Sequence, residues 1–189
     1  GPTGFTTYTS AEAYILLQDE LPQDVSDRVR TALSKAAHFI AKGQSEEDHL
    51  ANHHAMACLA VWKAYEVTGD ESLKNGYERV WQGFLSYHVF EEGWSREYDG
   101  IDPGYLSATV SFLGKVYQSN RDPLLLRVLE QSAEMCSYFV YPNGFYGGSL
   151  GSRNTQHFYP HGFEVLAAES PVAAAVAERT LTALDDGGL

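Results

Sequence analysis

Apolar residues recur along most of this chain with the period of an amphipathic α-helix. One expected helix shows the pattern well, because Val25, Val29, Leu33 and Ile40 fall on one stripe that ends at Gly43. No segment has the strict alternation of a core strand. The expected helices cover residues 10–21, 24–42, 50–68, 70–85, 105–118, a segment opened by Asp122-Pro123, then 163–168 and 171–184. The pattern therefore predicts an all-α fold.

Two long segments between these helices lack helical periodicity, and together they contain Gly, Trp, Tyr, Asp and Arg. They cover residues 89–104 and 142–162. Long irregular loops in compact domains are usually functional. In each hairpin the more apolar helix is expected to line the axis of the array as the inner helix, and the other to face water. Each long segment is expected to follow the second helix of a hairpin and to carry its side chains to the start of the next inner helix.

A repeat of about 52 residues runs through the chain. Tyr117 follows Tyr65 by 52 residues, and each Tyr is followed five residues later by an Asp that can cap the next helix. A Gly-aromatic pair at Gly93 recurs 51 residues later at Gly144. A repeat of this length predicts helical hairpins stacked side by side, about three and a half of them in this chain.

The same spacing groups polar residues. Counting back twelve residues from each Tyr reaches His53 and Tyr105, and one further period reaches His157. The repeat predicts that these three side chains lie at equivalent heights along one rim. Residues 52–54, 99–105 and 151–157 would share that rim. They supply Asn, His, Tyr, Asp and Arg, the residue types used for acid–base chemistry and for neutralising a carboxylate.

Length and termini bound the domain organisation. The 189 residues suit one domain, expected over residues 10–184. Gly1-Pro2 looks like a protease-cleavage scar, so residues 1–9 are expected to be a tag remnant and an N-terminal arm. Residues 185–189 are expected to be a frayed tail. The chain could be an excised piece of a longer protein, and the sequence does not indicate a compartment.

The charge balance excludes several partners. With 25 acidic and 13 basic residues the net charge is −12, which disfavours nucleic acid and anionic membrane surfaces. A polyanionic substrate would need a locally basic cleft. Cys58 and Cys136 fall within apolar helical patterns and are expected to be buried thiols.

Each residue at the start of the inner helices has two readings. Tyr105 is a candidate for proton transfer, or a tyrosine that packs at a helix start. His53 and His54 point about 100 degrees apart on a helix, so at most one is expected to face the axis. Asn52 is a candidate substrate ligand, or a helix-start residue whose side chain caps the helix.

The two long loops add further candidates. Arg153 is the clearest cation for a carboxylate, because a guanidinium group can bind one bidentately. His157 and His161 flank Phe158-Tyr159, as in a lid, a sugar-stacking platform or an ordinary packed loop. The remaining candidate substrate-binding residues are Trp94, Arg96, Asp99 and Asn154.

No metal or cofactor is expected. His49 and His53 are four residues apart, as are His157 and His161, a spacing that can bind zinc on a helical turn. Pro160 interrupts the second pair, and the first has no evident third ligand. The chain also lacks a phosphate-binding loop and a Ser or Cys nucleophile motif.

The stretch Asn52-His53-His54, together with Asp99-Gly100 followed by Tyr105, resembles the α/α-toroid polysaccharide lyases. The likeness is to the heparinase II/III-like group and its alginate-lyase relatives, and covers roughly residues 48–165. A full toroid has about six hairpins, so the resemblance implies an α/α-toroid-like fold that forms an incomplete ring here.

The resemblance also implies a reaction, β-elimination on a uronic acid. Asn52 would help neutralise the carboxylate, and Tyr105 would be the general acid or base. One of His53, His157 or His161 would be its partner.

Two classes of function follow. The first is a carbohydrate-active domain whose partner is a glycan or another sugar. The same toroid shape also houses sugar epimerases and glycoside hydrolases, so the shape does not fix the reaction. The second is a non-catalytic helical-repeat module that completes a larger enzyme, binds a partner or pairs with another copy, because an incomplete ring exposes apolar edges.

Overall fold

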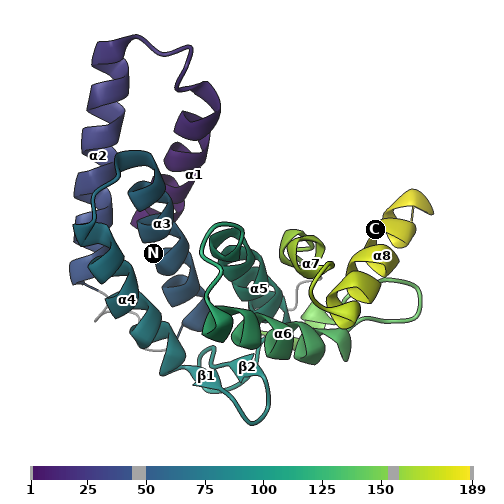
Figure 1. The fold of residues 1–189 in the computed structure, drawn as a ribbon. Helices are drawn as coiled ribbons and strands as arrows, with labels where there is room; N and C mark the ends of the chain where they lie inside the picture. Colours follow the sequence, from purple (N-terminus) through teal and green to yellow (C-terminus); the bar gives the residue numbers. More distant parts are fainter. Residues whose placement is uncertain (1, 44–49, 153–157, 188–189) are drawn as a thin grey trace. The chain divides into compact units, whose positions relative to one another are not determined.

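We describe the protein from a computed structural model that places residues 2–43, 50–152 and 158–187. These residues are mostly helical, which confirms the predicted all-α class (Figure 1). The elements are α1 (Pro2–Leu17), α2 (Gln23–Lys42), α3 (Ala51–Thr68), α4 (Ser72–Leu85), β1 (His88–Val89), β2 (Trp94–Ser95), α5 (Pro103–Tyr117), α6 (Pro123–Ser137), a 3-10 turn (Gly148–Leu150), α7 (His161–Leu166) and α8 (Pro171–Asp185). The toroid arrangement and the single domain over residues 10–184 stay predictions.

The chain forms two compact units, each described by itself. The first unit comprises residues 2–43 and 53–86, and holds α1, α2, most of α3, and α4. The second unit comprises residues 50–52, 87–152 and 158–187, and holds the short β-hairpin and α5 to α8.

Helix α1 in the first unit begins at Pro2, eight residues before the predicted start at Ser10. Residues 2–9, expected to belong to an N-terminal arm, are therefore helical. The buried residues of α1 are Gly4, Thr7, Ala11 and Tyr14. A Cβ at Gly4 would lie 3.2 Å from Met56 Cγ, so the missing side chain allows close packing. Because Gly and Thr carry little apolar signal, this first part of the stripe was not predicted.

Polar contacts also hold α1 against its neighbours. The Tyr14 hydroxyl lies 2.8 Å from Ser26 Oγ on α2. Lys63 of α3 is nearly buried, and its ammonium lies 3.4 Å from Glu12 and 2.8 Å from Glu66. A buried ammonium needs such partners, because desolvation alone would make it costly.

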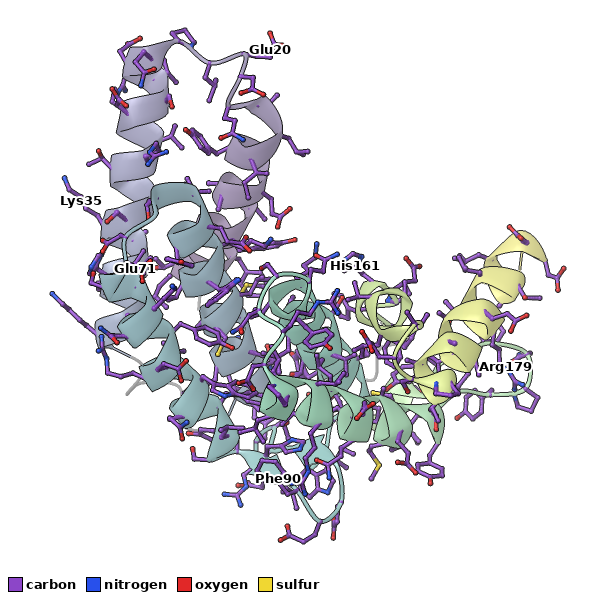
Figure 2. All side chains as sticks on the ribbon, viewed as in Figure 1. Glu20, Lys35, Glu71, Phe90, His161 and Arg179 are labelled. Atoms are coloured by element: carbon purple, nitrogen blue, oxygen red, sulfur yellow. The ribbon has the colours of Figure 1, made fainter. Side chains whose placement is uncertain are left out.

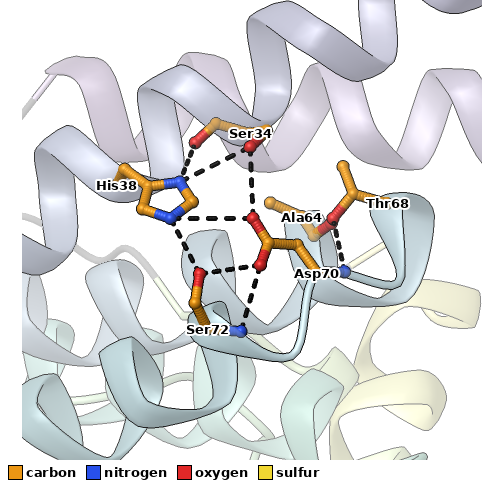
Figure 3. Close-up of polar contacts among 6 residues, drawn as sticks. All are labelled: Ser34, His38, Ala64, Thr68, Asp70 and Ser72. Carbon is orange, nitrogen blue, oxygen red and sulfur yellow. Dashed lines mark hydrogen bonds and ion pairs between the residues drawn. The ribbon is translucent and has the colours of Figure 1, made fainter.

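The Tyr-to-Asp spacing of the repeat marks the turn between α3 and α4 (Figure 3). Gly69, at φ 68°, donates its N–H to Tyr65 O over 2.8 Å and ends α3 as predicted. Asp70 accepts hydrogen bonds from the N–H and the hydroxyl of Ser72, which lower the pKa of Asp70. His38 Nε2 on α2 lies 3.0 Å from Ser72 Oγ, so the network links α2 to this turn.

The second Asp of the repeat caps its helix as predicted. Asp122 accepts hydrogen bonds from the N–H groups of Leu124 and Leu125 at 2.8 and 2.9 Å. Pro123 occupies the first helical position, where its missing N–H has no intrahelical partner to lose.

The glycine repeat in the second unit marks two turns that pack on helices. Gly93 has φ 75°, and a Cβ there would lie 2.7 Å from Gln131 O of α6. Gly144 has φ 82°, and a Cβ there would lie 2.4 Å from Ala183 Cβ and 2.8 Å from Arg179 O of α8. Both positions require glycine for the backbone conformation and for the close approach. The structure therefore supports a helical repeat-like architecture.

Short strand pairings flank these turns and were not predicted. Strands β1 and β2 pair antiparallel around the first turn, and Val140 forms an isolated bridge with Tyr146 around the second. Pairings this short leave no alternating pattern in the sequence. Phe90 lies in the first turn (Figure 2), and its carbonyl accepts a hydrogen bond from Gln131 Nε2 at 2.9 Å.

Gly144→Ala should destabilise the second unit strongly, because it adds a steric clash with α8 to the left-handed strain. Gly69→Ala is the matched control, since Gly69 also has a positive φ but a Cβ there meets nothing within 4 Å. We expect a loss of about 1–2 kcal/mol for Gly69→Ala, and a further loss of about 1–3 kcal/mol for Gly144→Ala. Urea unfolding measures both values, and equal losses would contradict the packing described here.

Candidate functional site

A buried carboxyl group lies in the loop between β2 and α5 of the second unit. The Glu97 side chain is buried within a tight turn. Its N–H donates to Gly100 O over 2.8 Å, and the Gly100 N–H donates back to Glu97 O over 3.0 Å. Glu97 also forms an isolated antiparallel bridge with Leu50, the residue before α3. The turn is therefore fastened to the start of α3.

The Glu97 carboxyl group binds Asn52, the second residue of α3. The backbone N–H of Asn52 donates to Glu97 Oε1 at 2.5 Å, and its side-chain amide donates to Oε2 at 2.8 Å. The Ala51 N–H donates to Arg96 O at 3.1 Å. Two of the N–H groups that lack intrahelical partners at this terminus are thus satisfied by the loop. Asn52 donates to a carboxyl group here and is not itself the cap.

The surroundings of Glu97 favour its protonated form. Burial raises the pKa of this carboxyl group from 4.5 to about 8. The two N–H donors of Asn52 oppose the rise because they stabilise the carboxylate, whereas the nearby charge of Asp102 adds to it. Glu97 is therefore mostly protonated at neutral pH. Strongly shifted carboxyl groups of this kind concentrate at functional sites.

A second buried acid, Asp102, lies at the start of α5. Its Oδ1 accepts the N–H of Tyr105 at 3.0 Å, which caps the helix. Its Oδ2 accepts both the N–H and the hydroxyl of Ser152, at 2.7 and 2.8 Å. A Cβ at Gly151 would lie 2.6 Å from both carboxylate oxygens. Asp102 thus ties the glycine-rich loop to Tyr105, and Gly151 permits the close approach.

Aromatic contacts hold the rest of that loop. The Tyr146 hydroxyl donates to Pro103 O at 2.8 Å, and burial raises the pKa of this phenol above its usual range. The ring of Phe158 lies 4.7 Å from Tyr146 and 5.0 Å from Phe163, between centroids. The Tyr159 N–H donates to Ser107 Oγ at 3.2 Å. The loop residues on both sides of 153–157 are therefore anchored to α5.

The structure brings some predicted residues together. Asn52 and Tyr105 belong to the second unit, each bound by an acid of the segment 97–102. Asp99 and Arg96 are exposed in the same loop. Trp94 of β2 donates its indole N–H to Glu92. His161 is the half-buried first residue of α7 (Figure 2).

Other predicted residues lie elsewhere. His53 and His54 belong to the first unit, where His53 is half-buried and His54 is buried. A Cβ at Gly83 of α4 would lie 3.5 Å from His54 Nδ1. The two imidazoles thus differ in burial, as expected for helix neighbours. Arg153, Asn154 and His157, like His49, lie outside the described residues. The rim of His53, Tyr105 and His157 stays a prediction.

No family model, curated protein or solved structure matched the chain in our comparisons. The resemblance to polysaccharide lyases therefore rests on the residues quoted for it. Within residues 2–43, 50–152 and 158–187, no cluster of three or more His, Cys, Asp or Glu side chains could hold a metal ion. No helix of the described chain is long and apolar enough to cross a membrane.

Sequence reasoning missed Glu97, and it included Asp102 and Ser152 in the expected rim segments without giving either residue a role. Asp102 could have been found, because Asp followed by Pro is a frequent helix start. Glu97 lies in an aperiodic loop, and its burial depends on Asn52, which is 45 residues away in the chain. Ser152 gave no signal of its own within the glycine-rich segment.

Two surface hollows recur with the repeat and do not include these residues. One, of about 360 Å³, lies between the Gly93 turn and α6, and the other, of about 350 Å³, between Pro142-Asn143 and α8. Both arise where a turn packs on the second α-helix that follows it in the chain. Their recurrence makes them a product of the repeat packing rather than evidence for a site.

The raised pKa of Glu97 predicts that folding stability falls with rising pH. Above pH 4.5 the unfolded chain releases this proton, whereas the folded chain keeps it up to about pH 8. The folded state then binds more protons, so its free energy of unfolding decreases by up to about 1.4 kcal/mol per pH unit over this interval. Glu97→Gln should remove this component from urea unfolding measured between pH 5 and 8.

Glu91→Gln is the control, because Glu91 is an exposed acid of the turn between β1 and β2. It should leave the dependence on pH unchanged. If Glu97→Gln and the unmodified protein share one slope, Glu97 does not hold its proton in the fold.

Proposed function

We propose that the second unit carries a carbohydrate-active site that performs β-elimination on uronic-acid-containing glycans. Tyr105 removes the proton from the carbon next to the uronate carboxylate, or donates a proton to the leaving oxygen. Asn52 helps neutralise the carboxylate. The observation that supports this most is the segment 97–102, whose two acids bind Asn52 and Tyr105. One short stretch of chain fixes both residues to which the family resemblance assigns the chemistry.

The exposure and charge of the surrounding residues suit this role. Tyr105 is half-buried, so part of the residue is exposed to solvent. Asn52 is buried, at 4% exposure, and one of the two hydrogens on its side-chain nitrogen is directed at Glu97. The proposal assigns the other hydrogen to a substrate carboxylate. Arg96 is exposed next to Glu97 and supplies a positive charge. Glu97 and Asp102 are positioning residues here, because both are buried and committed to protein donors.

A helical-repeat module that binds a partner is the second candidate. Its support comes from the C-terminal end of α1, where Leu16 is 81% exposed and Leu17 51% exposed. Apolar side chains grouped on a surface are typical of protein contacts. Light scattering tests this candidate: Leu16→Asp combined with Leu17→Asp should reduce any association of the protein, whereas a monomer before and after the change contradicts self-association.

Tyr105→Phe should lower the rate of elimination by a factor of about 10² to 10⁴, because it removes the proton-transfer group but keeps the ring. The assay follows the ultraviolet absorbance of unsaturated products from a panel of uronate polymers. Tyr141→Phe is the matched control, since Tyr141 is an exposed tyrosine of the second unit. Full activity of Tyr105→Phe would rule out Tyr105, and no absorbance change from any polymer would rule out the lyase.

A further inference from the structure

Tyr98 holds an unusual backbone conformation next to the proposed site. Its φ is 54°, in the left-handed region, and among the described residues the other positive φ values belong to glycines. A bulky residue in this region is strained, because its Cβ crowds the backbone. Strain of this kind collects at ligand-binding and catalytic sites.

The turn imposes this conformation. The two hydrogen bonds between Glu97 and Gly100 close a two-residue turn, which leaves Tyr98 and Asp99 at its tip. Tight turns of this kind favour Gly, Asn or Asp where φ is positive. Glu97 cannot move to relieve the strain, because its carboxyl group is bound to Asn52. The chain uses glycine at Gly93 and Gly144 but keeps a tyrosine here.

Burial of the Tyr98 ring does not offset the backbone strain, because the ring is only partly buried. The residue is 40% exposed, so much of its ring faces solvent. Its centroid lies 6.5 Å from that of Tyr105, with 54° between the planes. The neighbouring Ile101 is also partly exposed, at 36%. The Tyr98 ring is thus an exposed aromatic surface next to the proposed acid–base residue.

We propose that Tyr98 is a sugar-stacking residue, and that its ring and that of Tyr105 form a subsite for one pyranose ring of a glycan. The apolar C–H face of a sugar packs on an aromatic ring, and its hydroxyl groups remain free for polar partners. The inference rests on the proposed function for the ligand class, but its test does not require turnover. The turn holds the ring in place before the sugar binds, which limits the ordering cost of binding.

Three substitutions separate a binding role from a structural one. Tyr98→Gly and Tyr98→Asn suit a positive φ, so each should raise the melting temperature, by about 2–4 °C for a chain of this size. Both should weaken glycan binding at least about tenfold, because the stacking face is lost. Tyr98→Phe keeps the ring and should keep both the melting temperature and, within about threefold, the affinity.

Calorimetric titration measures the affinity with three probes: tetrasaccharides of galacturonate, of mannuronate and of glucose. Tyr141→Ala is the control, because it removes an exposed tyrosine of the same unit whose φ is not positive. It should change neither the affinity nor the melting temperature.

The outcomes distinguish this inference from the proposed function. If Tyr98→Gly loses binding and the unmodified protein forms no unsaturated product, the subsite is supported and the lyase is contradicted. Elimination that persists with unchanged affinity in Tyr98→Gly contradicts the subsite and supports the lyase. A lower melting temperature in Tyr98→Gly, or no binding of any probe by the unmodified protein, overturns the subsite.

Discussion

The second unit depends on satisfying two buried acids in one short loop. A carboxyl group removed from water is costly unless donors surround it. Glu97 finds its donors at the start of α3, and Asp102 finds them at the start of α5 and in the glycine-rich loop. Each acid therefore requires two distant parts of the chain to stay together. If one of these parts moved away, its acid would remain buried without hydrogen-bond donors, which would destabilise the unit.

The repeat explains how this loop comes to lie where it does. Its N-terminal side is fixed by the turn at Gly93, whose backbone approaches α6 more closely than any side chain would allow. Its C-terminal side continues into α5 through Asp102 and Pro103. A loop held at both ends can keep Tyr98 in a strained conformation that a free loop would relax. Packing of a repeated unit thus produces a rigid support for residues that are not repeated.

Periodicity and capping rules predicted the helices because both act between near neighbours. The ends at Gly69 and the cap at Asp122 follow from local backbone chemistry, so sequence alone could indicate them. The early start of α1 was not predicted, because the buried Gly4 has no side chain and so adds nothing to the apolar pattern of the sequence. The burial of Glu97 was not predicted because it depends on Asn52 of α3, which is 45 residues away in the chain. Long-range burial leaves no periodic trace, which is why the burial of Glu97 could not be predicted.

The local charge of the site also differs from what composition indicates. A net charge of −12 disfavours an acidic glycan, but net charge describes the whole surface. Glu97 is mostly neutral at pH 7, because burial raises its pKa to about 8. The charge of Asp102 is held by three protein donors. The exposed charged residues of the loop 96–102 are then Arg96 and Asp99, and their charges sum to zero. For the proposed uronate substrate, Arg96 would then be the exposed cation of this loop, and the buried Glu97 beside it would add little negative charge.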